Sequence, residues 1–234
     1  MKNYRTRKEL KKEVKKLLNK DLGKALMLYL VIIFLGILSM FSGKIEAKSL
    51  LIANYDPFAV YHGYARLLSI SGIAGLIFLS LFLSVLFRSL DWLRNNELEF
   101  SPFKSNFTYY RNPDWWKLIV IRVIVAIFTF LWMLLLIIPG YIKIFSYSQT
   151  FLIYKDVQEK GYGDKYKFTD YITKSRQLMD GNKWRFFVLQ LSYIGWYFLG
   201  YITFGIALIW VIPYVCMTNV NFYKDLVEQN PDII

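Results

Sequence analysis

The side chains of this sequence that could do chemistry are mainly cations placed in or beside apolar runs. Lys143 follows Pro139-Gly140 within an apolar stretch, and Arg122 lies inside another. In a hydrocarbon setting, a lone cation and the open backbone amides beside a proline turn can contact a phosphate or carboxylate. Four further cations gather near the N-terminus: Lys11, Lys12, Lys15 and Lys16. We expect these bases, together with Gly140, to contact anions such as lipid headgroups.

Two interpretations of Lys143 stay open. The stretch from Gly140 to Tyr154 has fifteen residues, or about 22 Å of helix at 1.5 Å per residue. That length is shorter than the hydrocarbon core of about 30 Å. Either the turn at Pro139 lies below the outer surface and Lys143 points into a recess, or the bilayer thins and Lys143 reaches the outer headgroups. Arg122 is expected to extend toward the inner interface.

The residues of known enzyme motifs are missing. The sequence has one histidine, His62, and one cysteine, Cys216, and it lacks HExxH, CxxC, P-loop and GxGxxG patterns. An intramembrane hydrolase would need Ser80, Ser146 or Ser148 to converge with other polar residues. The apolar segments hold no acidic residue, which argues against a proton-coupled carrier. We therefore expect no enzymatic activity, no cofactor and no metal, and the lone cysteine excludes an intramolecular disulfide.

The apolar runs determine the expected fold. The chain is 56% hydrophobic, yet segments 25–42, 68–87, 118–138 and 186–222 contain one charged residue, Arg122. A membrane span needs about 20 apolar residues, and the last segment is long enough for two. The sequence predicts an all-α, polytopic transmembrane protein with about six spans arranged as three helical hairpins. The first run is expected to be a retained span because its basic leader is too long for a signal peptide.

The basic residues predict the orientation. The net charge is +12, which on a soluble fold would suggest nucleic acid, but the apolar segments favour a membrane and no nucleic-acid partner. With six spans and an internal N-terminus, 24 of the 29 Lys and Arg residues fall on the cytoplasmic side. This is a strong positive-inside bias. Both termini are therefore expected in the cytoplasm.

Each hairpin is expected to follow an amphipathic helix on the cytoplasmic surface. Near the N-terminus, Leu10, Val14 and Leu17 recur at helical spacing among lysines, a pattern that suits an anionic inner leaflet; a solvated leader helix is the alternative. Ser101-Pro102 is typical of a helix start and Gly181 of a helix end. The single membrane domain divides into 1–23 (basic helix), 24–91 (hairpin one), 101–156 (surface helix and hairpin two) and 168–225 (surface helix and hairpin three).

Prolines and glycines indicate the turns. Pro139-Gly140 is expected to form the turn of hairpin two without a polar loop. In the last segment, Gly195, Gly200 and Gly205 offer places to turn, and Pro213 is expected to kink or break the helix that follows.

Short repeated strings are consistent with three similar units. Tyr154-Lys-Asp-Val-Gln-Glu159 and Tyr223-Lys-Asp-Leu-Val-Glu228 both end a proposed hairpin that contains Ile-Pro. An N-x-D-x-x-K string precedes a span at Asn19 and at Asn112. Two explanations stay open: the strings reflect true repetition, or they match by chance because segments at a membrane interface have similar composition.

The second half of the chain resembles a known family. The resemblance rests on three segments: IIPGYIKIFSYSQTFLIYKD from Ile137, SRQLMDGNKWRFFVLQLSYIGWYFLGYITFGIALIWVIPY from Ser175, and NFYKDL from Asn221. They resemble the bacterial integral-membrane family numbered 975 among domains of unknown function, most specifically from Ile137 to Leu226. The resemblance implies a multi-span protein of bacterial plasma membranes, with no catalytic residues to carry over. Ala207 stands where we expect a glycine of that family.

Two classes of function follow as hypotheses. The first is a non-enzymatic plasma-membrane protein that engages anionic lipid of the inner leaflet, a membrane-protein partner or a second copy of itself. The alternative is a transport, efflux or immunity-type component that acts on membrane-active peptides or lipids, in which Lys143 would be required for translocation.

Overall fold

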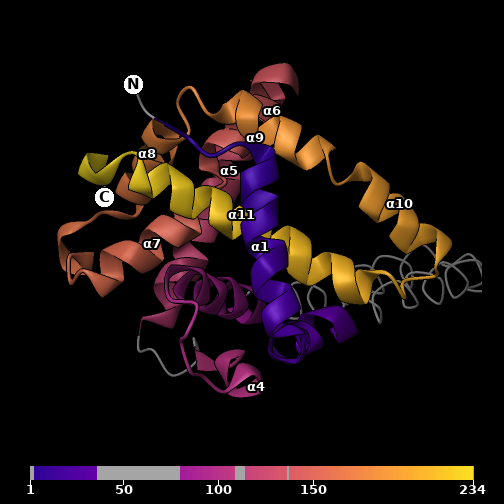
Figure 1. The fold of residues 1–234 in the computed structure, drawn as a ribbon. Coiled ribbons are helices and arrows are strands. Elements are labelled where there is room, and N and C mark those ends of the chain that lie inside the picture. Colours follow the sequence, from indigo (N-terminus) through magenta and orange to yellow (C-terminus); the bar gives the residue numbers. More distant parts are fainter. Residues whose placement is uncertain (1–2, 36–79, 109–113, 136, 234) are drawn as a thin grey trace, which may run out of the picture.

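The computed structural model describes residues 3–35, 80–108, 114–135 and 137–233, and every regular element in them is a helix (Figure 1), which confirms the predicted all-α class. The α-helices are α1 (Arg7–Lys20), α4 (Pro102–Ser105), α5 (Trp115–Leu135), α6 (Ile137–Tyr147), α7 (Thr150–Glu159), α8 (Phe168–Leu178), α9 (Lys183–Leu191), α10 (Ile194–Ile202) and α11 (Leu208–Glu228). Residues 22–35 and 80–94 are also helical, and short 3-10 turns occupy Gly163–Lys165 and Pro231–Ile233.

Helix α1 packs its apolar stripe against protein. Leu10, Val14, Leu17 and Leu18 are buried, and α1 lies across α11. The stripe expected to suit a lipid leaflet is therefore used for the core. This corrects the sequence interpretation, because amphipathic periodicity reports a buried face without saying what covers it.

The helical segments 22–35 and 80–94 lie side by side. The hydroxyls of Tyr29 and Ser89 share a hydrogen bond of 2.9 Å, and both side chains are fully buried. Lys24 donates to the carbonyl oxygen of Leu98 over 2.8 Å. Residues 36–79, which include His62 and most of the predicted hairpin one, lie outside the described residues, so the two spans of that hairpin stay a prediction.

Helix α5 is the described helix that is long and apolar enough to cross a membrane. It qualifies over Trp115–Leu134, and only 17% of that window is buried inside the protein. The exposed side chains along it include Val123, Ile127, Phe130 and Leu134. A further apolar helix, Leu22–Leu35, is shorter.

The turn of the second hairpin differs from the prediction. Pro139 and Gly140 lie in the first turn of α6, not between the helices. A proline is tolerated there because its missing N–H has no intrahelical partner in the first turn. A Cβ added at Gly140 would come within 2.7 Å of Cγ and 3.0 Å of Cα of Met133. The glycine therefore permits close approach of α5 and α6 after the turn.

The predicted fourth span is interrupted. Helix α6 ends at Tyr147 and α7 begins at Thr150. The hydroxyl of Ser175 on α8 binds both sides of the break: it donates to the carbonyl of Ser146 over 2.8 Å and accepts from the backbone N–H of Gln149 over 3.2 Å. The backbone groups freed by the break are thus satisfied inside the protein.

The third amphipathic helix is α8, and its predicted face is buried. Tyr171, Ile172, Ser175 and Met179 lie in the core. Gly181 follows with φ of +72°, as expected for a left-handed helix end. In the second unit, Ser101 stands at the N-cap position of α4 with Pro102 as the first helical residue, but that helix has four residues.

The last apolar segment forms a projecting hairpin. Helices α9 and α10 are separated at Ser192-Tyr193, and the chain reverses between α10 and α11 at Thr203–Ala207 (Figure 1). Gly205, with φ of +93°, is the glycine used for this turn. Pro213 lies inside α11 without ending it. Of the two expected outcomes, the break does not occur and the kink stays a prediction.

The repeated Tyr-Lys-Asp strings have the same local geometry. Lys155 pairs with Glu159 and Lys224 with Glu228, four residues on in each helix. Asp156 is held by Arg94 through two hydrogen bonds of 2.6 and 2.7 Å, and Asp225 is held by Arg185. The Tyr223 hydroxyl donates to Asp156 over 2.7 Å and so joins the two sites.

Candidate functional site

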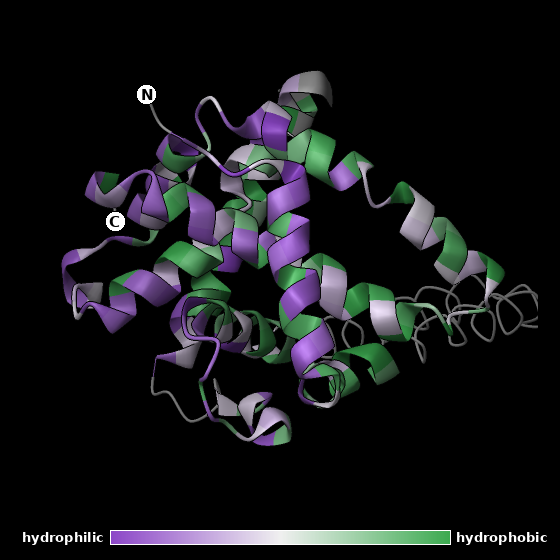
Figure 2. Ribbon diagram, in the orientation of Figure 1, coloured by the Kyte–Doolittle hydropathy of each residue, from purple (hydrophilic) through white to green (hydrophobic). Residues whose placement is uncertain are grey.

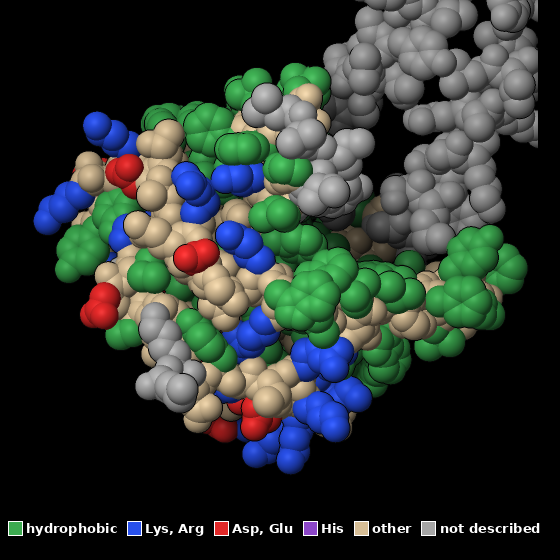
Figure 3. All heavy atoms as spheres, turned by 90° about the horizontal axis from the view of Figure 1, so that it is seen from above, with side chains coloured by type: hydrophobic (Ala, Val, Ile, Leu, Met, Phe, Trp, Pro, Cys, Tyr) green, Lys and Arg blue, Asp and Glu red, His purple; other side chains and the backbone are tan. Residues whose placement is uncertain are grey.

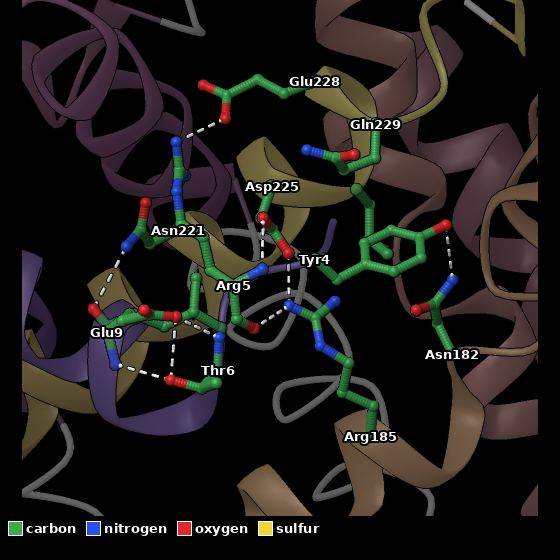
Figure 4. Close-up of polar contacts among 12 residues, drawn as sticks. Tyr4, Arg5, Thr6, Glu9, Asn182, Arg185, Asn221, Asp225, Glu228 and Gln229 are labelled. Atoms are coloured by element: carbon green, nitrogen blue, oxygen red, sulfur yellow. Dashed lines mark hydrogen bonds and ion pairs between the residues drawn. The ribbon is translucent and has the colours of Figure 1, made fainter. Parts of the chain in front are cut away.

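The start of the chain is fastened to the C-terminal part of α11 (Figure 4). The fully buried Asp225 accepts a hydrogen bond of 3.0 Å from the backbone N–H of Arg5 and another from the Arg185 guanidinium. The same guanidinium donates to the carbonyl of Arg5 over 2.5 Å. Charged hydrogen bonds to a buried carboxylate are among the stronger ones in proteins, so this cluster determines where α1 begins.

A capping box then starts α1. The Glu9 backbone N–H donates to the Thr6 hydroxyl over 3.3 Å, and the Glu9 carboxylate accepts from the Thr6 backbone N–H over 2.6 Å. These bonds to the Thr6 backbone and hydroxyl lower the pKa of Glu9. Reciprocal capping of this kind satisfies two of the open amides of the first turn. The basic helix therefore has a fixed start and direction.

Lys11 does not face outward with the other lysines. Its ammonium donates to the Ser192 hydroxyl over 2.6 Å and lies 4.7 Å from the centre of the Tyr193 ring. Burial lowers the pKa of Lys11, with a further contribution from the charges of Arg7 and Lys15. Lys11 thus holds the break between α9 and α10. This corrects its predicted role as a headgroup contact.

The remaining lysines of the predicted group lie on the outside of α1. Lys12, Lys15 and Lys16 are exposed. The Lys15 ammonium lies 5.7 Å from the centre of the Tyr214 ring, in a small cleft that Trp196 and Trp210 also line. We call Lys15, Trp196, Trp210 and Tyr214 the basic-aromatic surface, and Lys12 lies three residues before Lys15 on α1. Such a pairing of ammonium groups with Trp and Tyr is typical of the membrane–water boundary.

The apolar hairpin begins at this surface. Its outward side chains are large and exposed, and Figure 2 colours α10 and the start of α11 mainly green and white, with little of the purple that marks hydrophilic residues. They include Ile194, Tyr197, Phe198, Tyr201, Ile202, Phe204, Ile206 and Trp210. Phe204, at the turn, is 88% exposed. Figure 3 shows the same contrast, with apolar side chains on the projecting part and Lys and Arg on the neighbouring body.

Exposed apolar area of this extent has a physical meaning. Soluble monomers rarely expose large contiguous apolar patches, and those they have mark contact with a partner or a membrane. The hairpin and the outward side of α5 both have this character. The basic-aromatic surface is thus a cation and amphipathic rings next to side chains that water solvates poorly.

The two cations of the predicted hairpin two, Arg122 and Lys143, are placed differently. Arg122 is exposed on α5, where it lines an open groove of about 510 Å³ with Thr129 and Ser148. Lys143 is half-buried, and its ammonium lies 4.2 Å from the centre of the Trp132 ring. The aromatic face therefore gives Lys143 a partner within hairpin two. Gly140 is buried and packs against Met133, and a recess at this turn stays a prediction.

Two of the three serines that a hydrolase would need donate to backbone carbonyls. Ser146 donates to the carbonyl of Ile142 over 2.9 Å, and Ser148 donates to that of Phe145 over 2.8 Å. Ser84 likewise donates to the Ser80 carbonyl over 2.9 Å. Among the described residues, no group of three or more His, Cys, Asp or Glu side chains could hold a metal ion.

The structure adds residues that sequence reasoning missed. Asp156 and Asp225 are 3% and 0% exposed and each holds an arginine from another helix. The signal was present in the repeated Tyr-Lys-Asp strings, which sequence reasoning used only to argue for repetition. A carboxylate at the end of an apolar run must be solvated or paired, and here it is paired.

A comparison with known proteins gives the family of this region. Residues 141–230 match the model of the family described as "Protein of unknown function (DUF975)". The matched range begins in α6 and ends just after α11, and it confirms the predicted resemblance there. No curated protein and no solved structure matches the chain.

Proposed function

Taking the membership of residues 141–230 in this family as the premise, we propose that the chain is a non-enzymatic, multi-pass protein of the bacterial plasma membrane that engages anionic lipid through α1. In this proposal about six spans form three hairpins, and both termini lie in the cytoplasm. A membrane-protein partner or a second copy of the chain would pack against the apolar sides that lipid leaves free.

One observation carries the proposal. The exposed lysines of α1 adjoin the apolar hairpin at the basic-aromatic surface, where Lys15 lies 5.7 Å from the centre of the Tyr214 ring. A hairpin immersed in hydrocarbon as far as Trp196 and Trp210 would bring Lys12 and Lys15 to headgroup level. Each base near an anionic surface contributes about 1 kcal/mol.

The packing of α1 changes how this contact would work. Because Leu10 and Val14 are buried in the protein, the helix has no apolar stripe left to insert. Its attraction to lipid would be electrostatic, and salt would weaken it. Helix insertion, by contrast, depends on apolar area and responds little to salt.

The test is a lipid-retention experiment on the detergent-purified full chain. At equal concentrations of phosphatidylglycerol and phosphatidylcholine, native mass spectrometry should find the anionic lipid retained in preference. A Lys12→Gln/Lys15→Gln/Lys16→Gln variant should lose most of this preference, since three bases together contribute up to about 3 kcal/mol. Lys104→Gln/Lys165→Gln/Lys167→Gln removes the same charge elsewhere and should keep it. If both triple variants prefer phosphatidylglycerol to the same extent, α1 is not the part of the chain that binds anionic lipid.

The position of Lys143 favours transport or efflux of a membrane-active peptide or lipid as a second candidate. A half-buried cation over Trp132 within a hairpin is a group that an anionic cargo could displace from its ring. Under this proposal, Lys143→Met abolishes translocation in reconstituted vesicles while the protein remains folded. An unchanged rate would exclude the residue from any transport step.

A further inference from the structure

A second site lies away from α1, where the end of helix 80–94 meets α7. The structure has a cavity of about 220 Å³ there. Phe87 and Arg88 line it from helix 80–94, and Tyr154 and Lys155 line it from α7. A volume of this size admits a small organic group of the kind that pockets hold, rather than a single water.

The charges around the cavity balance. Lys155, whose side chain is 5% exposed, pairs with Asp91 over 2.5 Å and with Glu159 over 2.6 Å. Arg88 approaches Asp91 only to 3.5 Å, which is longer than an ordinary charged hydrogen bond. Two cations and two carboxylates therefore face the space. A neutral wall of this kind favours a singly charged or zwitterionic occupant over a multiply charged one.

Two polar atoms of lining residues are buried without partners. The hydroxyl of Tyr154, a residue 3% exposed, and Nε of Arg88 make no hydrogen bond. Their residues are otherwise held in place, Tyr154 by the Tyr171 ring at 5.3 Å and Arg88 by the Phe100 ring at 5.6 Å. Buried donors left unpaired destabilise a protein, and native structures retain few of them. Both atoms are donors that an acceptor oxygen would satisfy.

The lining also offers acceptors. Glu159 is exposed, and Gln158 makes only a long contact of 3.5 Å, to the Tyr171 hydroxyl. Hydroxyl groups on an occupant could donate to these two side chains. A lining with both donors and acceptors suits a molecule that has both an anionic oxygen and free hydroxyls.

We propose that this cavity binds a glycerol phosphodiester, with a phosphate oxygen at Arg88 Nε and the Tyr154 hydroxyl and the glycerol hydroxyls toward Glu159. A phosphodiester carries a single negative charge, so the carboxylates of Asp91 and Glu159 repel it less than they would a doubly charged phosphate monoester, and guanidinium groups bind phosphate oxygens well. The group could belong to an intact phospholipid or to a soluble headgroup. The proposal does not depend on α1, so it can fail or succeed independently of the lipid contact proposed above.

The test uses the full chain in detergent and two probes. One is glycerophosphoglycerol, which has no acyl chains, and the other is dihexanoyl phosphatidylglycerol. Isothermal titration calorimetry should detect binding of at least one. Binding of both shows that the headgroup is sufficient, binding of the lipid alone assigns a phospholipid, and binding of the soluble probe alone assigns a free headgroup. Binding of neither overturns the proposal.

Two variants locate the binding. Tyr154→Phe removes a hydroxyl that makes no hydrogen bond in the described structure, so the fold should be unaffected while affinity falls about fivefold, the effect of one hydrogen bond. Arg88→Lys keeps the charge but removes the guanidinium and should weaken binding more than Tyr154→Phe. Tyr162→Phe, at an exposed position outside the lining, should bind like the wild type. Binding that neither Tyr154→Phe nor Arg88→Lys weakens would also overturn the proposal.

Discussion

The two ends of α11 differ in what surrounds them. At its start, Ile209 and Trp210 are exposed and the helix forms one arm of the projecting hairpin. Toward its end, Asn221 and Asp225 are fully buried and hydrogen-bonded to the N-terminal segment. One helix therefore passes from an exposed apolar arm into a packed body held by charged hydrogen bonds. The lesson is that neither burial nor polarity is uniform along α11, and that each end of this helix needs a different explanation.

The largest expected loss of stability comes from a substitution at the packed end of α11. Asp225→Asn removes the charge of a fully buried carboxylate, which deprives the partly buried Arg185 of its partner and weakens the anchor of Arg5. Loss of one partner of a buried pair costs about 3–5 kcal/mol. We expect denaturation of the purified protein in detergent at a clearly lower denaturant concentration. Asp156→Asn, which strands Arg94 at the equivalent site, should have a similar effect, and wild-type stability in both variants would contradict the proposed importance of these pairs.

The next largest effect tests whether hydrocarbon or water surrounds the projecting hairpin at the start of α11. Phe198 is 62% exposed on α10, so Phe198→Asp would change stability by less than about 0.5 kcal/mol if water surrounded the hairpin. In hydrocarbon the same change costs about 2.5–3.5 kcal/mol. Stability measured in bilayer discs should therefore fall by several kcal/mol. Phe103→Asp, at an exposed position on α4, is the matched control and should have little effect.

A smaller effect is expected at the hairpin of α5 and α6. Gly140→Ala places a Cβ within 2.7 Å of the Met133 side chain and 3.0 Å of its backbone. Overpacking of this kind costs about 1–3 kcal/mol. Gly23→Ala, where nothing lies within 4 Å of the added Cβ, tests the general effect of replacing a glycine. Equal stability of the two variants would mean that α5 and α6 do not need the close approach.

The smallest effect is expected for an exposed ion pair. Asp180 and Lys183 lie 3.7 Å apart, and the Asp180 side chain is 83% exposed. Exposed pairs of this kind contribute between 0 and about 1 kcal/mol. Asp180→Asn should therefore leave the denaturation midpoint within experimental error, in contrast to Asp225→Asn. A large loss of stability in Asp180→Asn would contradict the distinction between exposed and buried carboxylates on which the comparison rests.

Local sequence signals predicted the elements better than their surroundings. The helical class, the helix end at Gly181 and the turn in the last apolar segment all follow from residue spacing and glycine chemistry, because these properties are local. The apolar stripe with Leu10 and Val14 was predicted as well, but the helix that packs against it was not. Periodicity shows that a face is apolar and leaves open whether α11 or lipid lies against it.

The wrong predictions about residues of the candidate site have the same cause. Pro139-Gly140 looks like a loop in sequence, yet proline is equally suited to the first turn of a helix, and only the position of Met133 shows that the glycine permits close packing. Lys11 differs from Lys12 and Lys15 through its contacts with Ser192 and Tyr193, which are about 180 positions away in the chain. Distant pairings of this kind cannot be obtained from one sequence.

The most direct test of the central claim is cysteine labelling of bacterial cells that express the chain with Cys216→Ser. A membrane-impermeant maleimide would be applied to Lys12→Cys and, separately, to Phe198→Cys, before and after the cells are opened. The account predicts that neither position reacts in intact cells, that position 12 reacts once the cytoplasmic face is accessible, and that position 198 stays protected in both. Labelling of position 12 in intact cells, or equally rapid labelling of position 198 in opened membranes, would contradict it.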